Sequence, residues 1–306
     1  MIVLAACLAL APVSAPVLAP VSAPIPPPGF AQEAPAPALE KKIQRAFPKL
    51  KGPARRKAEA ALLTLRRGKT QKDLAKAVAS LTEIGAGVAP LVLSGWRRFE
   101  PDPDAEEEKE DRRPLLEAVL NGVLAEEDLQ IAWDEVGKRT PESARVFLLR
   151  RWADSGREDA EEFLLERLKK SAGRAAYEAA RGLGRRGLKE SVPILHAWFM
   201  ESWAESKSSL RADFQGVERG PLSAACLALV NLEDRAARLA GMRMFELLGS
   251  KEHAPALRTH LKNTDPSIKV AAINGLRVIL DGDPPLDKAS VLALVEETRK
   301  WETRIP

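Results

Sequence analysis

The feature that most constrains this chain is an internal similarity with a step of 31 positions. Phe245 and Leu276 close two similar segments, in which basic, apolar, small and large residues fall at the same places. Counting back from Phe245 in steps of 31 reaches three more large apolar residues, which are Phe214, Leu183 and Trp152. Self-similarity at a fixed step of this length is typical of repeat proteins, in which each unit buries its apolar face against its neighbours.

Each of these segments is followed by a second one that begins near a proline. The prolines are Pro90, Pro193 and Pro255, and the glycines that precede them are Gly85, Gly184 and Gly249. Proline suits the first turn of a helix, because no intrahelical donor is lost there. Glycine can end the preceding helix in the left-handed conformation. The predicted unit is therefore a helix, a tight turn and a second helix.

The composition agrees with helices throughout the body of the chain. Alanine, leucine, arginine and glutamate dominate it, and these residues lose little rotamer entropy in a helix. No alternating apolar run bounded by turn residues is present from residue 55 onward. The sequence therefore predicts an all-α fold, in which the first helices approach closely through small residues at Ala240, Ala272 and Gly275.

The segment from Asp265 to Leu276 resembles the first helix of a HEAT repeat. It has the Asp-Pro start, the apolar–basic pair, the small residues and the closing leucine of that pattern. The step of 31 is similar to that of the compact bacterial HEAT-like repeats grouped with phycobilisome lyases. The likeness is strong over 233–280, moderate over 141–232 and loose over 55–138. It implies a right-handed α-α superhelix, a solenoid of about six or seven helix pairs.

The amino-terminal region has a different composition. The first 32 residues contain no Asp, Glu, Lys or Arg, and their apolar start is too short to span a bilayer. We interpret residues 1–31 as a signal peptide, 32–52 as a Pro/Ala-rich basic linker and 53–304 as the HEAT-like domain. The expected location is the periplasm or the exterior. The stretch that ends at Cys7 also matches a lipoprotein cleavage motif, so a lipid anchor at this cysteine stays an alternative.

Charge is distributed unevenly along the chain. Residues 41–98 hold 15 basic and 3 acidic side chains, and an acidic segment at residues 100–111 follows directly. A basic helix pair can attract nucleic acid or an anionic surface. The acidic loop could equally neutralise it within the same molecule. We favour neutralisation, because a solvated charged face is the commoner arrangement and export argues against nucleic acid as a partner.

Two tryptophans are candidate partner-binding residues. Trp198 and Trp203 are five positions apart on an expected second helix, so both cannot face the same core stripe. One of them could then be exposed on the inner, concave face of the array, where a partner would bind. Packing of both side chains within the array is the alternative, and we favour it. Arg258 and Lys262 lie on another expected second helix and are candidates for the same face.

No metal, cofactor or catalytic residue is predicted. His253 and His260 are seven positions apart on one expected helix, about two turns, so a single ion cannot be held by both. His196 is isolated, and all three histidines are interpreted as exposed or capping residues. Cys226 is the only thiol left after removal of the leader, which excludes a disulfide and a cysteine-based metal site.

The function that this sequence favours is a non-enzymatic scaffold that binds a protein partner. It has no Gly-rich phosphate loop, no Gly-x-Ser-x-Gly elbow and no His-Glu-x-x-His pair. The alternative is a helical-repeat enzyme, a lyase or a DNA-glycosylase-like protein, with a site on the concave face. The neighbours Trp133 and Asp134 are the only residues similar to such a site, and chance adjacency is the commoner reason for a pair of this kind.

Overall fold

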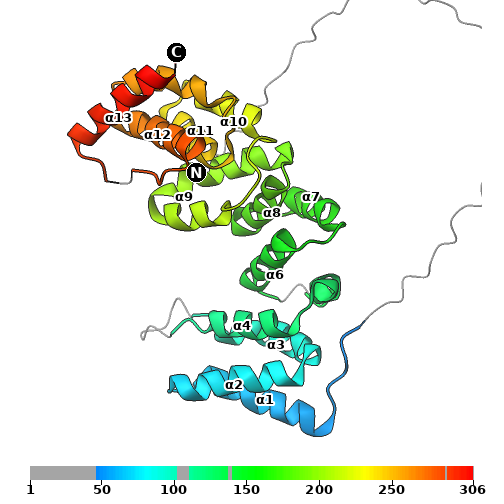
Figure 1. The fold of residues 1–306 in the computed structure, drawn as a ribbon. Coiled ribbons are helices and arrows are strands. Elements are labelled where there is room, and N and C mark those ends of the chain that lie inside the picture. The colour runs from blue at the N-terminus through cyan, green and yellow to red at the C-terminus, as the bar shows by residue number, and fades with distance from the viewer. Residues whose placement is uncertain (1–45, 102–109, 137–139, 287, 306) are drawn as a thin grey trace, which may run out of the picture. The chain divides into compact units, whose positions relative to one another are not determined.

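The computed structural model describes residues 46–101, 110–136, 140–286 and 288–305, which belong to one compact unit, Arg45–Pro306. Every regular element within these ranges is helical, and none of the described residues forms a strand (Figure 1). The all-α prediction is confirmed. The predicted signal peptide, the lipidation alternative at Cys7, most of the predicted linker and residues 102–109 of the acidic segment lie outside the described residues.

Thirteen α-helices are found in the described part of the chain. Their bounds are α1 Gly52–Arg67, α2 Gln71–Ile84, α3 Ala89–Gly95, α4 Arg113–Val123, α5 Leu129–Asp134, α6 Glu142–Asp154, α7 Ala160–Lys170, α8 Gly173–Arg185, α9 Val192–Asp213, α10 Ser223–Val230, α11 Arg235–Leu248, α12 Pro266–Leu276 and α13 Val291–Arg304. Short turns of 3-10 helix join several of them, and the longest is η5, Ala254–Lys262. A π-helical turn, η6, extends α12 over Arg277–Asp281.

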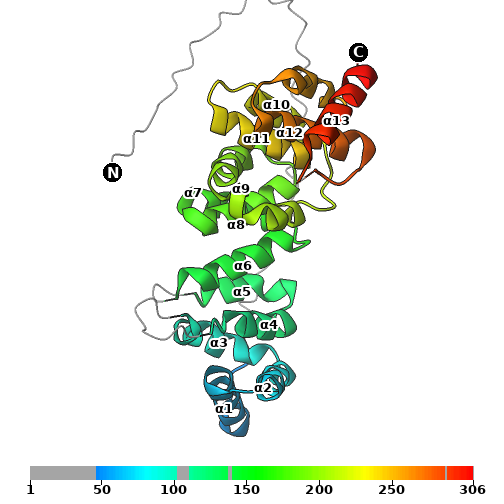
Figure 2. The same cartoon turned by 90° about the vertical axis from the view of Figure 1, so that its left-hand side faces the viewer.

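The helix starts follow the step that the sequence contains. Helices α6 and α8 begin 31 residues apart, α8 and α11 begin 62 apart, and α11 and α12 begin 31 apart. The elements that follow them, α9, α10 and η5, also begin 31 residues apart. Elements close in the chain pack together, as α6 does with α8, α10 with α11 and α11 with α12 (Figure 2).

The helix that starts at Val192 is longer than the other described helices. It is α9, which runs unbroken for 22 residues and reaches the position before Phe214, so Phe214 closes no separate first helix. No glycine or proline occurs between Pro193 and Gly216, so nothing in the sequence interrupts the helix there. Phe214 is the residue that caps α9 and is buried, as the other four large apolar residues of the series are.

The helix-start and helix-end expectations have different outcomes. Pro90, Pro193 and Pro255 all lie in the first turn of a helix, as predicted. Gly85 has a φ of 85°, so it does leave α2 in a conformation that favours glycine. The expectation is wrong for Gly184, which lies within α8, and for Gly249, whose φ is −72°.

The small residues do bring helices together. A Cβ on Gly182 would lie 2.7 Å from atoms of Ala153 and Leu164, and a Cβ on Gly275 would lie 2.6 Å from Leu257 Cδ1. Ala240 and Ala272 are completely buried. The close approach of α8 to α6 therefore requires a residue with no side chain at Gly182, where a Cβ would also lie 2.8 Å from the Ala153 Cα. At Gly275 the end of the Leu257 side chain would have to move instead.

Apolar side chains fill the space between the helices in three clusters. The first is formed mainly by α1 to α4, the second by α6 to α8, and the largest by α9 to α13. Phe47, from the region assigned to the linker, is buried in the first cluster, and Leu50 packs against it. The end of that predicted linker is therefore held on the helical body by apolar contacts.

Candidate binding surface

The two candidate tryptophans both pack against neighbouring side chains. Trp203 is buried, and Trp198 is half-buried with its ring stacked on Tyr177 at a centroid distance of 4.8 Å. Neither is exposed, so the alternative of an exposed tryptophan is wrong and the favoured one, packing, is confirmed. The long, uninterrupted α9 gives neighbours to both: Tyr177 of α8 covers Trp198, while Arg211 and Arg243 pack over Trp203.

Arg258 and Lys262 are exposed, and they lie beside α13. Arg258 Nη2 is 3.4 Å from the main-chain oxygen of Glu302, and Lys262 Nζ is 3.9 Å from the carboxylate of the same residue. These contacts lie on η5 and α13, whereas the contacts of Trp198 are made with α8. The structure therefore records no contact between these cations and either tryptophan, and it does not show the four candidates as one group.

The three histidines take part in packing. His196 Nε2 is 2.8 Å from the main-chain oxygen of Ala237, and His253 Nδ1 is 3.0 Å from Ser223 Oγ. His260 is buried, and this burial, followed by the charge of Arg238, lowers the pKa of its imidazole. None of the three is exposed, so that part of the expectation is wrong. Among the described residues, no group of three or more His, Cys, Asp and Glu is placed to hold a metal ion.

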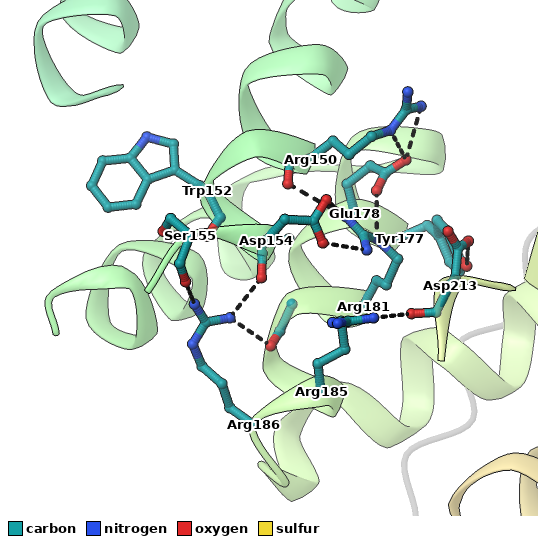
Figure 3. A network of polar contacts seen from close by, with 12 residues as sticks. Arg150, Trp152, Asp154, Ser155, Tyr177, Glu178, Arg181, Arg185, Arg186 and Asp213 are labelled. Carbon is teal, nitrogen blue, oxygen red and sulfur yellow. Dashed lines mark hydrogen bonds and ion pairs between the residues drawn. The ribbon is translucent and has the colours of Figure 1, made fainter. Parts of the chain in front are cut away.

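A network of arginines and carboxylates crosses the interface between α6 and α8 (Figure 3). Glu178 of α8 is buried and accepts a hydrogen bond from Arg181 Nε at 2.9 Å. Arg181 also donates from both terminal nitrogens to the two carboxylate oxygens of Asp154, at 2.7 and 3.0 Å. Arg150 and Arg174 approach Glu178 Oε1 at 3.4 and 2.9 Å. Three arginines and two carboxylates thus form the network, in which Arg150–Glu178 and Arg181–Asp154 are the pairs that cross from α6 to α8.

The geometry explains why these charges tolerate burial. Desolvation disfavours the charged form of Arg181, but Asp154 and Glu178 more than offset this and raise the pKa of its guanidinium above the ordinary value. Bidentate pairing with Asp154 satisfies the fork of guanidinium donors, which is the arrangement that makes a buried arginine acceptable. The network therefore fixes the position of α8 on α6.

Polar contacts continue from this network to the end of α9. Tyr177 donates to Asp213 Oδ2 at 2.5 Å, and Arg185 donates to the main-chain oxygen of Asp213 at 2.6 Å (Figure 3). Burial and then the hydrogen bond to Asp213 raise the pKa of the Tyr177 hydroxyl. On the other side, Arg186 donates to the main-chain oxygen of Ser155 at 2.7 Å. Side chains of α8 thus contact the ends of both α6 and α9.

An open groove of about 770 Å³ lies beside this network. Its wall includes Arg113 and Glu117 of α4, Glu142 and Arg150 of α6, and Arg174 of α8. Arg150 is the link to the network, since it contacts Glu178 and lies 3.7 Å from Glu117. The groove, which we call the charged groove, is lined by the following twelve residues: Arg97, Glu100, Asp111, Arg113, Pro114, Glu117, Pro141, Glu142, Ser143, Val146, Arg150 and Arg174.

A chain of hydrogen bonds holds one wall of the charged groove in place. Trp96 Nε1 donates to Ser143 Oγ at 2.8 Å, and Ser143 Oγ donates to Glu100 Oε1 at 2.6 Å. Trp96 is completely buried, so its ring is a fixed anchor for Ser143. The carboxylate of Glu100 is therefore oriented by a buried aromatic side chain from the adjoining helical turn.

The neutralisation of residues 41–98 that was predicted for the acidic segment is not seen at the described ends of that segment, whose ion pairs are made with Arg112 and Arg113. Asp111 pairs with Arg113 at 2.6 Å, and this hydrogen bond lowers the pKa of the Asp111 carboxyl. Glu110 lies 3.5 Å from Arg112, whose guanidinium also donates to the main-chain oxygens of Leu65 and Gly68. These partners of the acids are arginines of the segment that follows, and the contacts of residues 102–109 lie outside the described residues.

The pair singled out for the enzyme alternative has structural contacts. Asp134 Oδ1 accepts from Gln130 Nε2 at 2.8 Å, one helical turn away. Trp133 packs edge-on against Phe163 at 5.3 Å, and the Arg167 guanidinium lies 5.3 Å from its ring centroid. Nothing in this geometry favours catalysis by the pair.

The charged network was missed by the sequence reasoning. Arg150, Arg181 and Arg243 are separated by 31 and 62 positions, and each lies two residues before a large apolar residue of the series. An arginine repeated at the place next to a core residue was the available indication. A basic side chain is usually exposed, so sequence alone did not separate these three from the others.

Comparison with known proteins gives no relative for this chain. No family model, no curated protein and no solved structure matches it. Among the described helices, none is long and apolar enough by itself to cross a membrane. The two segments Gln71–Ile84 and Ala86–Phe99, which are bent relative to each other, reach the length and apolar composition of a membrane span only when they are counted together.

Proposed function

We propose that this chain is an exported array of HEAT-like helix pairs, a solenoid, that binds a protein partner along the charged groove. The observation that carries the proposal is that α4, α6 and α8 all contribute side chains to this groove. A repeat array whose units each add residues to one continuous surface is suited to holding an extended partner. The spacing of helix starts by 31 or 62 residues supports the array.

The charge of the groove defines the kind of partner that it would accept. Its wall holds four arginines and four carboxylates, so a partner segment that carries both charges could pair with it. Electrostatic complementarity of this kind gives specificity and a fast association rate, and its contribution falls as salt rises. The groove is open and most of its lining residues are charged, which suits a surface segment of a folded partner better than a small apolar molecule.

Swapping charges in the groove is expected to abolish capture of the partner. Arg97 and Glu142 are exposed, so Arg97→Glu combined with Glu142→Lys should leave the fold intact. The measurement is affinity capture from an envelope fraction with residues 32–306 as bait, comparing each captured protein between the parent and the double variant. We expect at least one protein to be captured by the parent and lost, by roughly tenfold or more, with the double variant.

The control for this capture is a charge swap away from the groove. Lys72→Glu combined with Glu218→Lys changes two exposed residues outside the lining of the charged groove. Like the groove variant, it replaces one cation by an acid and one acid by a cation, so the net charge stays the same. The proposal fails if the groove variant and this control capture the same proteins in the same amounts as the parent.

A further inference from the structure

Arg150, Arg181 and Arg243, which each lie two residues before a large apolar residue of the 31-residue series, differ in their partners. Arg181 is paired with Asp154 and Glu178, and Arg150 lies near Glu117 and Glu178. Arg243, in α11, has no hydrogen bond or ion pair with any described residue. At two of the three places, therefore, carboxylates of the same chain face the guanidinium, and at the third no such partner is found among the described residues.

The surroundings of Arg243 hold its guanidinium in position. Its Cζ lies 5.1 Å from the centroid of the Trp203 ring, and Arg211 lies against the same ring at 5.2 Å. The nearest acid by charge interaction is Glu246, which is buried and accepts hydrogen bonds from Arg211 at 2.8 and 3.4 Å. The acid nearest to Arg243 is therefore hydrogen-bonded to Arg211 instead.

Arg243 lines a pocket of about 440 Å³ between α9, α11 and α12, which we call the Arg243 pocket. Lys207, Arg211 and Lys288 also contribute to its wall, so the described part of the lining holds four cations and one acid, Glu246, which pairs with Arg211. Trp203, Val270 and Leu294 supply apolar surface within the same pocket. A ligand that fits it has an anionic group next to an apolar portion.

The energetics point in the same direction. Arg243 is half-buried, and burial, the largest influence, lowers the pKa of its guanidinium to about 10, with the charge of Glu246 acting the opposite way. A partly desolvated charge without a hydrogen-bonded partner is costly, and a bound anion would restore the pairing that Arg181 already has. The pocket is therefore arranged for an acidic group that comes from outside the described chain.

We infer that the Arg243 pocket receives a carboxylate of a bound partner protein, an acidic side chain with an apolar neighbour that packs on Trp203. A carboxylate is favoured because carboxylates of this chain already fill the equivalent places at Arg150 and Arg181. The guanidinium fork matches a carboxylate in a bidentate manner. This inference rests on the proposed function, since it assigns one contact of the partner.

The test uses the indole N–H signal of Trp203 in nuclear magnetic resonance spectra, assigned through Trp203→Phe. The probes are acetyl-Leu-Glu-Leu-amide, its isosteric control acetyl-Leu-Gln-Leu-amide, and inorganic phosphate, each added to about 10 mM to allow weak binding. We expect a saturable shift with the glutamate peptide and roughly tenfold weaker binding of the glutamine peptide. Arg243→Gln should remove this difference, while Arg299→Gln, at an exposed position of α13, should retain it.

Three results would overturn the assignment. Equal shifts with both peptides would show that the carboxylate is not recognised, and an unchanged response of Arg243→Gln would show that Arg243 does not recognise it. A saturable shift with phosphate but none with the glutamate peptide would assign the pocket to a phosphate group. If the glutamate peptide binds as expected but the capture experiment recovers no groove-dependent protein, the proposed function is wrong and the assignment of the Arg243 pocket is retained. If a groove-dependent protein is captured but the glutamate peptide does not bind, only the assignment of the Arg243 pocket is wrong.

A stability comparison provides a second readout that does not depend on a ligand. If Arg243 lacks a partner in the free protein, Arg243→Met should shift the unfolding midpoint by no more than about 2 °C. Arg181→Met, which removes one of the two cations that lie 2.9 Å from buried Glu178, should lower the midpoint by several times as much. Equal losses in the two variants would mean that Arg243 is already paired within the protein.

Discussion

Replacing Ala272 with glutamate is expected to lower the free energy of unfolding by about 3–5 kcal/mol. Ala272 is completely buried on α12, and α12 packs against α11, η5 and α13. A carboxylate introduced there would lose its hydration without gaining a partner, or it would force the neighbouring helices apart. The measurement is the unfolding free energy from urea denaturation, followed by helical circular dichroism.

The matched control for this substitution is Ala204→Glu. Ala204 lies inside α9, so the change of helix propensity is similar, but its side chain is exposed. Its expected effect is within about 0.5 kcal/mol. Equal effects at the two positions would mean that Ala272 does not lie in a helix interface, and the register built on the 31-residue step would be wrong.

Removing the charge of Glu178 is expected to cost about 3–5 kcal/mol of unfolding free energy in the isosteric variant Glu178→Gln. Arg181 is almost fully buried, and Glu178 is one of its two acidic partners. Taking away one member of a buried network leaves the remaining charges unsatisfied, and this penalty exceeds the value of the bond itself. Urea denaturation at low and high salt is the measurement, and the loss should persist at high salt because the site excludes solvent.

An exposed carboxylate with similar partners provides the control. Glu166 contacts Arg167 and Lys170 at 2.6 Å each, but its side chain is 47% exposed. Glu166→Gln should cost about 0–1 kcal/mol, because water screens such pairs. In addition, Glu178→Gln combined with Arg181→Met should recover part of the loss, since both charges leave the interface together. A double variant as unstable as the sum of the single variants would contradict the coupling.

The apolar part of this fold is readable from the sequence. The residues of the series, such as Trp152 and Leu183, are all buried, because apolar periodicity reports which side chains leave water. The prolines mark helix starts for a local reason, since the missing donor costs nothing there. The continuation of α9 up to Asp213 is also readable, because no glycine or proline separates Pro193 from Gly216.

The polar part could not be read in the same way. Glu178 and Arg181 look like solvent-exposed helix residues in the sequence, and only the closeness of α6 makes them a buried network with Asp154. Among the described residues, Arg243 has no hydrogen-bonded acid, because Arg211, a residue from another helix, pairs with Glu246. Such pairings are set by tertiary packing, which a local pattern does not contain.

The most direct test of the proposed array is a cross-link between the charged groove and its partner. Burial raises the pKa of the Cys226 thiol to about 12, so it should not react with a maleimide at neutral pH. A benzophenone maleimide can therefore be attached at one introduced cysteine of residues 32–306, Glu142→Cys in the groove or Glu218→Cys outside it. Illumination in an envelope fraction, followed by mass spectrometry, should give one dominant protein adduct from position 142 and not from position 218. Adducts that are absent from position 142, or the same at both positions, would contradict the account.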